Sequence, residues 1–442
     1  MPNAFSLATP LRLLIVFSFH ATAGLVLTEP TFHGNLARTG VYEGDGPKKF
    51  GGVKWTFQTG GPIVASPVIS EGVIYIGSAD KNFYAIEQKT GAQKWKFATG
   101  GAISSSATVA HGLVYFLSYD GGCYALDART GALAWRFATQ FEKRFEARGL
   151  HGQEPKEQSM PDVFDFFTSS PAVYENRVYF GSGDSNVYAL DARTGELAWK
   201  FATGGVVHSS PSIAHGMVYI GSFDSFVYAL DAATGAEKWR FAGGQDPEKH
   251  NQVGFTSSAA VVGATLYIGC RDGHLYALAS DTGAKKWEFT SKPAWISGTP
   301  AVREGLLYVG TGSSLQFVGL EAETGQTRFT YNMKTGVFSS AALAGDLAYI
   351  GNANGRLQVF DVKSGLLAWE FQTEASKKDA MKILKPDGGF SDNMGAEVFH
   401  DFEDMYILMS RRFSVGAIVS SPVIDHGEVY FGSADGLLYA LH

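Results

Sequence analysis

The chain has 442 residues, which is too long for one small domain, and its 45% hydrophobic and 18% charged residues are typical of a folded rather than a disordered protein. Its 53 glycines and 13% aromatic residues favour a turn-rich β protein. The formal net charge of −7, without any run rich in lysine and arginine, excludes a typical nucleic-acid-binding surface. Only two cysteines, Cys123 and Cys270, are present, which excludes a disulfide framework and a cysteine-rich metal site.

The N-terminal residues have the pattern of a signal peptide. Arg12 precedes an almost wholly apolar stretch over residues 13–27, and Ala21-Thr22-Ala23 is an A-x-A cleavage site. This stretch of 15 residues is short, since a membrane span needs about 20, and no cysteine stands near the site for a lipid anchor. We expect a signal peptide over 1–23, an N-terminal extension over 24–52, export to the periplasm or the cell exterior, and no transmembrane segment after the signal peptide.

A unit of about 40 residues recurs through the rest of the chain. It is marked by an aromatic residue near its end, at Trp55, Trp95, Trp135, Trp199, Trp239, Trp287, Phe329 and Trp369. The successive spacings are 40, 40, 64, 40, 48, 42 and 40 residues. A period near 40 with four short strand signals is typical of a propeller blade, and we expect the seven tryptophans of the series to dock neighbouring blades.

The unit is clearest over residues 205–244. We expect its first strand at 206–212, its second at 217–222 and its third at 227–231, with a fourth that carries Trp239 and Phe241. Glycines recur in the turn before the fourth strand, where a positive φ suits them. An aspartate recurs in the turn before the third strand, at Asp80, Asp120, Asp184, Asp224, Asp272 and Asp435. Because these carboxylates are spread around the ring, we interpret them as turn-stabilising groups rather than as calcium ligands.

The units count to eight. A hydroxyl residue stands at the same position in each, at Ser66, Ser106, Ser170, Ser210, Ser258, Thr299, Ser340 and Ser421. The last unit, from Val415 to His442, has only three strand signals, and the segment Lys54-Trp55-Thr56-Phe57 at the other end supplies the fourth. We therefore predict an all-β fold over residues 53–442, an eight-bladed β-propeller closed by pairing of the N-terminal strand with the C-terminal blade.

The repeat also carries a family resemblance. The pattern Ala-x-Asp-x-x-Thr-Gly-x-x-x-Trp, seen from Ala189 to Trp199 and from Ala229 to Trp239, resembles the pyrroloquinoline-quinone-like (PQQ-like) repeat. The resemblance covers nearly all of residues 53–442 and implies kinship with the quinoprotein alcohol dehydrogenase-like superfamily, which includes BamB-like scaffolds. These relatives share the ring but not the chemistry, so the fold does not choose between enzyme and scaffold.

Three insertions interrupt the repeat, at about 141–165, 245–252 and 374–413. All three connect the last strand of one blade to the first strand of the next, so we expect them to gather over one mouth of the ring and to carry the function. Their candidate ligand-binding residues are Arg144, Arg148, His151, His250, Asn251, Gln252, Arg411 and Arg412. Arginine and histidine over a channel suit an anionic ligand. Alternatively, Arg411 or Arg412 pairs with the nearby acids Asp401, Glu403 and Asp404.

Two further candidates lie on the blades themselves. The position two residues before the recurrent hydroxyl is polar in blades 2 to 6 and apolar in blades 7, 8 and 1, and His208 is its one ionisable member. Trp295 is the one tryptophan outside the docking series, and it precedes blade 6. It could stack on a planar ligand or bury the inserts.

No residue is assigned a catalytic or metal-binding role. The resembling dehydrogenases use a quinone, calcium and adjacent cysteines, whereas Cys123 and Cys270 lie three blades apart, and no Cys-x-x-Cys-His motif is present. We expect no cofactor, with PQQ and calcium as an alternative that no motif supports. The function that we expect is non-catalytic binding of a small anionic ligand or a protein partner through the insert-bearing face, as in a BamB-like scaffold. A reduced quinoprotein dehydrogenase is the alternative.

Overall fold

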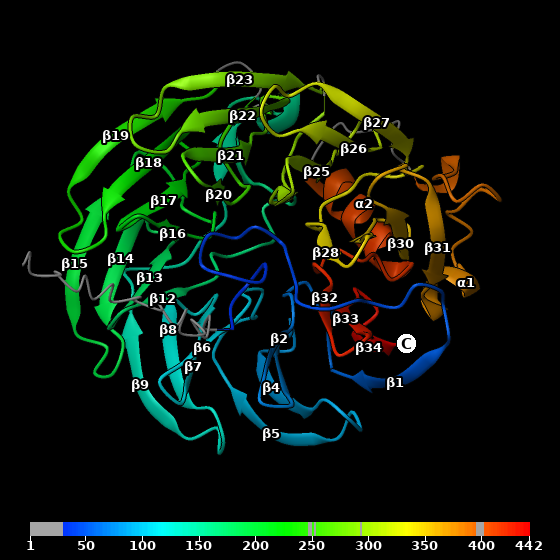
Figure 1. Cartoon of the computed structure of the whole chain (residues 1–442), viewed down its shortest axis with the longest axis horizontal. Coiled ribbons are helices and arrows are strands. Elements are labelled where there is room, and N and C mark those ends of the chain that lie inside the picture. Colours follow the sequence, from blue (N-terminus) through cyan, green and yellow to red (C-terminus); the bar gives the residue numbers. More distant parts are fainter. Residues whose placement is uncertain (1–29, 246–249, 252, 292–293, 395–401) are drawn as a thin grey trace, which may run out of the picture.

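The structure is a ring of β-sheets. The computed structural model describes residues 30–245, 250–251, 253–291, 294–394 and 402–442. Within these residues, eight four-stranded antiparallel sheets surround a central axis like the blades of a propeller (Figure 1). This arrangement confirms the predicted all-β, eight-bladed fold.

Each blade runs outward from a short inner strand to a long outer strand. The first four blades consist of β2 (Val68–Ser70), β3 (Val73–Gly77), β4 (Asn82–Glu87) and β5 (Gln93–Ala98); β6 (Thr108–Ala110), β7 (Leu113–Ser118), β8 (Gly122–Asp127) and β9 (Leu133–Ala138); β12 (Ala172–Tyr174), β13 (Arg177–Gly181), β14 (Asn186–Asp191) and β15 (Leu197–Ala202); and β16 (Ser212–Ala214), β17 (Met217–Gly221), β18 (Phe226–Asp231) and β19 (Glu237–Ala242).

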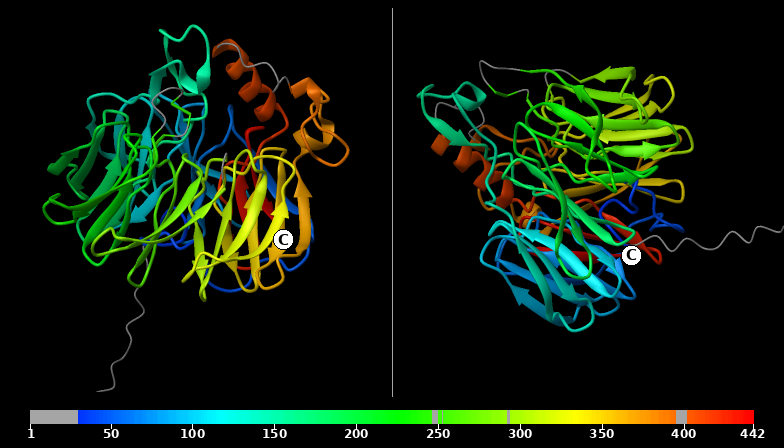
Figure 2. Two further views of the ribbon diagram at one scale, coloured as in Figure 1. Left: turned by 90° about the horizontal axis from the view of Figure 1, so that it is seen from above. Right: turned by 90° about the vertical axis from the view of Figure 1, so that its left-hand side faces the viewer.

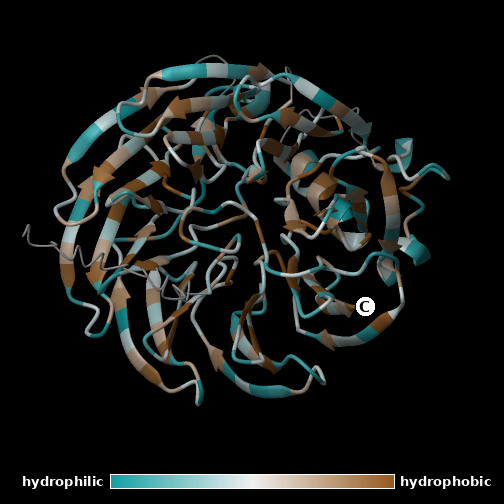
Figure 3. Cartoon of the chain, in the orientation of Figure 1, coloured by the Kyte–Doolittle hydropathy of each residue, from teal (hydrophilic) through white to brown (hydrophobic). Residues whose placement is uncertain are grey.

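The remaining blades follow the same order. They consist of β20 (Ala260–Val262), β21 (Thr265–Gly269), β22 (His274–Ala279) and β23 (Lys285–Thr290); β24 (Ala301–Arg303), β25 (Leu306–Gly310), β26 (Gln316–Glu321) and β27 (Thr327–Asn332); β28 (Ala342–Ala344), β29 (Leu347–Gly351), β30 (Arg356–Asp361) and β31 (Leu367–Gln372); and β32 (Val423–Asp425), β33 (Glu428–Gly432), β34 (Leu437–Leu441) and β1 (Val53–Gln58). The two middle strands of each blade are almost wholly buried, whereas the outer strands alternate between hydrophobic and hydrophilic residues (Figure 3).

The two ends of the propeller join in the eighth blade, as predicted. β1 pairs antiparallel with β34, with Trp55 opposite Ala440 and Phe57 opposite Leu438. The N-terminal strand thereby completes a sheet whose other three strands come from the C-terminus, and β34 has a strand on both sides.

The inner strands are shorter than predicted. In the unit over 205–244, the expected strand at 206–212 reduces to β16, which begins only at Ser212. The residues before it run along the channel wall, and the backbone N–H of Ser210 there donates to the Ser258 hydroxyl of the next blade instead of to a strand. The hydrophobic pattern of this segment therefore reflects burial between blades rather than sheet pairing.

The tryptophans dock neighbouring blades, as expected. Trp199 Nε1 donates to the Ala232 carbonyl of the next blade at 3.0 Å, and its counterparts Trp55, Trp95, Trp135, Trp239 and Trp287 do the same to theirs. Trp369 donates instead to Pro47 of the N-terminal segment. The indole of Trp199 also covers Gly235, where an added Cβ would lie 2.6 Å from the ring. Gly235 has a φ of +73°, so this turn requires glycine both for its backbone and for the close approach of the ring.

The recurrent aspartates stabilise turns, as predicted. In blade 4, Asp224 accepts hydrogen bonds from the backbone N–H groups of Gly204 and Phe226 and from the Tyr228 hydroxyl. The same pattern recurs in the other blades that carry this aspartate.

The N-terminal segment over residues 30–50 closes one mouth of the channel. Carbonyl groups of Pro30, Leu36, Ala37, Thr39 and Gly40 accept hydrogen bonds from the inner strands of blades 2, 4, 5, 6 and 7, respectively. The fully buried Arg38 donates to three further backbone carbonyls in the same region. Access to the channel is therefore left to the opposite mouth.

The first and third inserts lie together on that opposite face (Figure 2), and most of the second lies outside the described residues. The first contains the hairpin of β10 (Glu146–Arg148) and β11 (Ser159–Pro161) around the 3-10 turn η1 (Leu150–Gly152). The third contains α1 (Glu374–Lys378), η2 (Asp392–Met394) and α2 (Phe402–Ser414). The grouping of these two inserts agrees with the expected position of the function-bearing loops.

Candidate functional site

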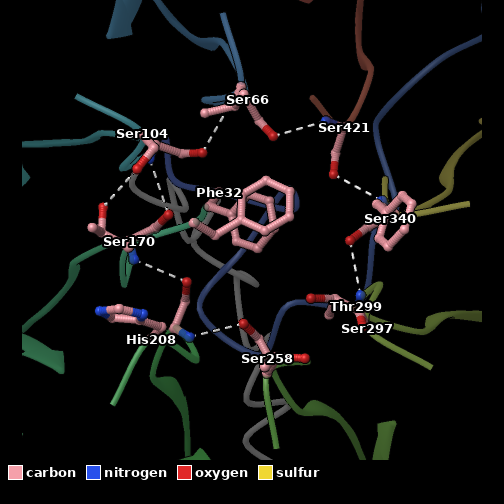
Figure 4. Close-up of a pocket in the computed structure, with 17 residues that line it drawn as sticks. Phe32, Ser66, Ser104, Ser170, His208, Ser258, Ser297, Thr299, Ser340 and Ser421 are labelled. Atoms are coloured by element: carbon pink, nitrogen blue, oxygen red, sulfur yellow. Dashed lines mark hydrogen bonds between the residues drawn. The ribbon is translucent and has the colours of Figure 1, made fainter. Parts of the chain in front are cut away.

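A ring of hydroxyl groups lines the channel (Figure 4). Seven backbone N–H groups of the recurrent hydroxyl positions each donate to the hydroxyl of the neighbouring blade, at 2.8 to 3.0 Å. Phe32 of the N-terminal segment projects into the middle of this ring. The remaining space is only about 40 Å³, which is room for no more than a few water molecules.

The residues two positions before the recurrent hydroxyls in sequence form the surface on which the inserts pack. The apolar members Val64, Phe338 and Val419 pack with Val163 and Phe166 of the first insert and with Met405 and Met409 of α2. The third insert therefore lies over the part of the ring whose channel positions are apolar. The polar members of this series belong to blades 2 to 6, and charged side chains of the first insert lie over that part of the mouth.

His208 binds two carboxylates of the first insert. Its Nδ1 lies 2.7 Å from Asp165 Oδ1 and its Nε2 lies 2.7 Å from Glu142 Oε1, and all three side chains are at least 96% buried. Burial lowers the pKa of His208, but the two carboxylates outweigh it and raise the pKa to about 10. His208 is therefore an imidazolium at neutral pH that ties the insert to blade 4.

A second buried ion pair stands beside it. Arg271, which is 1% exposed, places Nη1 2.6 Å from Asp162 Oδ2, and His151 Nε2 lies 3.2 Å from Asp162 Oδ1. Burial raises the pKa of Asp162, but Arg271 and His151 together hold it well below its usual range. The guanidinium of Arg271 also covers the ring of Trp295 at 3.9 Å.

A cavity of about 380 Å³ opens between this ion pair and the third insert. This volume lies within the range of about 300 to 1,000 Å³ that is usual for small-molecule sites. Its apolar lining comes from Phe164, Trp295, Leu315, Phe338, Phe390, Met394, Met405 and Leu408. Its polar side chains are His151, Asn251, Ser313 and Arg412, so the site is an apolar pocket with few polar groups.

Arg412 of α2 is the charged group of this cavity. Its guanidinium carbon lies 5.3 Å from the ring centre of Phe338 and 5.7 Å from those of Phe164 and Phe390. Burial lowers the pKa of Arg412 to about 10, so the side chain stays charged at neutral pH. The expected alternative, a pair with Glu403 or Asp404, does not form, and Asp401 lies outside the described residues.

The structure brings four of the ten candidate residues to the cavity and separates the others. His151, Asn251, Trp295 and Arg412 line it, and His151 Nδ1 lies 2.7 Å from Asn251 Oδ1. His208 lies deeper, at the channel. Outside the cavity lining stand Arg144, which interacts with Tyr119, the exposed Arg148 of β10, the half-buried His250, and Arg411, which donates to the Asn393 carbonyl. Gln252 lies outside the described residues.

Sequence reasoning missed Arg271 and its partner Asp162. The residue before the recurrent turn aspartate is Ala79, Tyr119, Gly183, Phe223, Arg271 and Ala434 in the six blades that carry it. Arg271 is the one charged member of this series, and this difference could have singled it out. The apolar wall from Phe390 to Leu408 carries no repeat, so no comparison within the chain could indicate it.

The cavity does not fit a calcium-bound quinone. Calcium requires clustered oxygen ligands, most often carboxylates, whereas the described residues that line the cavity include no aspartate or glutamate. The nearest insert acids, Asp162, Asp165 and Glu142, are already bound to Arg271, His151 and His208. One face of Trp295, which could otherwise support a planar ring, is covered by Arg271.

Comparison with known structures finds propellers with very different roles. BamB from Moraxella catarrhalis aligns with a TM-score of 0.62 at 16% identity over 88% of this chain and 97% of its own. A europium-containing methanol dehydrogenase aligns with a TM-score of 0.66 at 14% identity, over 92% of this chain and 96% of its own. Quinohemoprotein alcohol dehydrogenase from Comamonas testosteroni gives 0.69 at 14% identity, over 93% and 80%. At these identities the likeness concerns the fold alone.

Sequence comparison is more specific. The chain matches no curated protein, and no helix within its described residues is long and apolar enough to cross a membrane. A family model described as outer membrane protein assembly factor BamB matches residues 47–154, 150–293 and 271–386. These ranges cover most of the ring, including all seven docking tryptophans and five of the six recurrent aspartates. The chain therefore belongs to this BamB family of PQQ-like propellers.

Proposed function

We propose that the protein is an exported, non-catalytic propeller that binds a small organic ligand at its insert-bearing face, in the cavity beneath α2. The observation that carries this proposal is the cavity itself, about 380 Å³ of mostly apolar space that contains the charged side chain of Arg412. The inserts that form it rest on a rigid ring, and the opposite mouth is closed by residues 30–50. A ligand therefore enters from the insert face.

The test is a fluorescence titration with 1-anilinonaphthalene-8-sulfonate, an apolar anionic probe. We expect saturable binding with one site per chain, because the cavity offers one apolar volume of suitable size. Leu408→Trp, which fills the cavity wall, should abolish this binding, whereas Tyr406→Trp on the exposed side of the same helix should retain it. Unsaturable binding, or equal binding by the folded Leu408→Trp variant, would exclude the cavity as a ligand site.

A quinoprotein dehydrogenase is the second candidate, favoured by the two dehydrogenases of similar fold. Calorimetric titration with pyrroloquinoline quinone, with and without calcium, separates it from the first. Because no carboxylate is among the described residues of the cavity lining, we expect no calcium-dependent binding. Tight binding that requires calcium would replace the ligand-binding proposal with an enzymatic one.

The family description also makes a protein partner a reasonable role for the same face. α2 exposes Tyr406 at 63% and Ile407 at 39%, which would suit such a contact. Pull-down with Tyr406→Ser and Ile407→Ser would test this role independently of the cavity.

Export is proposed from the signal-peptide pattern, which lies outside the described residues. N-terminal sequencing of the protein recovered from a periplasmic fraction tests it. A mature chain that begins at Gly24 is expected, and an intact chain confined to the cytosol would contradict export.

A further inference from the structure

Arg412 is a charge without a partner. Within the described residues it forms no ion pair, its buried Nε has no hydrogen-bond partner, and Nη1 has only the weak acceptor Met409 Sδ at 3.8 Å. Three aromatic rings surround the guanidinium and compensate part of its lost hydration. They cannot replace the hydrogen bonds that a guanidinium makes in water.

The two fully buried arginines do have partners, whereas Arg412, which is half-buried, has none within the described residues. Arg38 donates to three backbone carbonyls, and Arg271 pairs with Asp162. A buried charge is normally retained only where it is paired, because desolvation costs several kcal/mol. An unpaired guanidinium that lines a cavity therefore indicates an anion that comes from outside the chain.

The apolar lining of the rest of the cavity indicates that the remainder of this anion is apolar. Phe390, Met394, Met405 and Leu408 form an apolar wall on the third insert, on the same insert as Arg412. Methionine adapts its shape to different partners, so this wall suits a range of hydrocarbon or aromatic groups rather than one rigid outline.

Among the described residues that line the cavity, Arg412 is the one cation without a partner, and this limits the charge of the anion. Arg271 is neutralised by Asp162, so Arg412 alone balances the ligand. A dianion such as a phosphate monoester would bring a second charge into an apolar site without a counter-ion. A carboxylate has one charge and matches the planar fork of a guanidinium with two parallel hydrogen bonds.

We propose that the cavity beneath α2 binds an amphiphilic monocarboxylate, with the carboxylate on Arg412 and the apolar body along the wall from Phe390 to Leu408. This inference rests on the proposed ligand-binding function and specifies the class of ligand.

The test compares three probes of equal chain length by calorimetric titration: octanoate, octanol and octyl phosphate. The wild-type protein should bind octanoate at least about tenfold more tightly than octanol, since a charge-assisted hydrogen bond is worth this factor or more. It should also prefer octanoate to octyl phosphate. Equal affinity for octanoate and octanol would overturn the proposal, as would a preference for octyl phosphate.

Arg412→Met and Arg411→Met form a matched pair of variants. Arg411 precedes Arg412 on α2 but donates to the Asn393 carbonyl, outside the cavity lining. Arg412→Met should bind octanoate and octanol equally and should melt at the same or a higher temperature than the wild type, because it removes an unpaired, half-buried charge. Arg411→Met should keep the preference for octanoate. A preference that survives in Arg412→Met would assign recognition to another group.

The outcomes separate the two levels of inference. If Leu408→Trp blocks the fluorescent probe but octanoate and octanol bind the wild type equally, the cavity is a ligand site and the monocarboxylate assignment is wrong. If neither alcohol nor carboxylate binds and the fluorescent probe does not saturate, the ligand-binding function itself fails.

Discussion

His208 contacts two carboxylates of the first insert. We therefore expect its protonation to make the stability of the fold depend on pH. The imidazolium form binds Asp165 and Glu142 at 2.7 Å on each side. The neutral form keeps only one N–H, so it would leave one carboxylate buried opposite a lone pair. The protonated form of His208 is therefore needed for both contacts between the first insert and blade 4.

The pH dependence of stability follows from this proton. The pKa of His208 is raised from about 6.5 to about 10, so the folded state holds a proton that the unfolded state releases between these values. The stabilisation is fully present below pH 6.5 and is lost as the pH rises toward 10. We expect the free energy of unfolding to fall across this window by up to roughly 1.4 kcal/mol per pH unit from this group alone.

Thermal denaturation of the wild type and His208→Gln at pH 6.5, 8 and 9.5 measures this effect. The wild type should lose melting temperature with rising pH more steeply than His208→Gln. His215→Gln is the control, because His215 is exposed and contacts only the Gly263 carbonyl through its ring. Parallel curves for wild type and His208→Gln would mean that His208 is not the protonated centre of this cluster.

The sequence was most informative about residues whose role repeats. Trp199, Gly235 and Asp224 have counterparts at about 40-residue intervals, so one interpretation could be tested against several copies. Even there, position 235 requires glycine for a second reason that the pattern did not indicate, which is the close approach of the Trp199 ring. Arg271, Asp162 and Arg412 act through contacts between distant segments, and no local pattern determines such contacts.

At the scale of elements, α2 is attached by one face. Met405 and Met409 are 2% and 6% exposed and pack against the apolar channel positions, whereas Tyr406 faces solvent. The inner strands show the opposite relation between pattern and structure, since hydrophobic residues predicted as strand 206–212 serve burial along the channel instead. For α2 and for residues 206–212, the sequence predicted that hydrophobic side chains are buried. It did not predict which residues they pack against, because hydrophobic contact is non-directional.

The docking of α2 should be separable from the folding of the ring. Met409→Ala removes the side chain that packs in one cluster with Val419 and Phe338, which costs about 2 to 5 kcal/mol and should detach the helix. We expect proteolysis of the third insert to accelerate about tenfold or more, because cleavage follows local opening. The ring itself should unfold at nearly the same temperature.

Limited proteolysis followed by mass spectrometry measures this effect, with Tyr406→Ala as the control on the exposed side of the helix. The control should be cleaved at the wild-type rate. Loss of the whole cooperative transition in Met409→Ala would show instead that α2 is an integral part of the core.

At the scale of the whole molecule, the ring depends on the blade that joins its two ends. Trp55 lies on β1, the N-terminal strand that completes the eighth blade. Its indole donates to the Gln88 carbonyl of the first blade and covers the turn glycine Gly91. Trp199 makes the equivalent contacts within the continuous part of the chain. If β1 is held as firmly as any other outer strand, the two tryptophans contribute equally to stability.

We therefore expect Trp55→Ala and Trp199→Ala each to lower the free energy of unfolding by about 3 kcal/mol, the lower end for loss of a large packed aromatic side chain. Equilibrium denaturation in urea measures both, and the dependence on urea should stay that of the wild type because the same surface is exposed on unfolding. Trp55→Ala with a cost near zero would mean that β1 frays and that the ring is closed by the other contacts of the N-terminal segment. A cost well above that of Trp199→Ala, with a shallower dependence on urea, would mean that closure is the step on which the cooperativity of all eight blades depends, because an open ring leaves β34 with an unpaired edge.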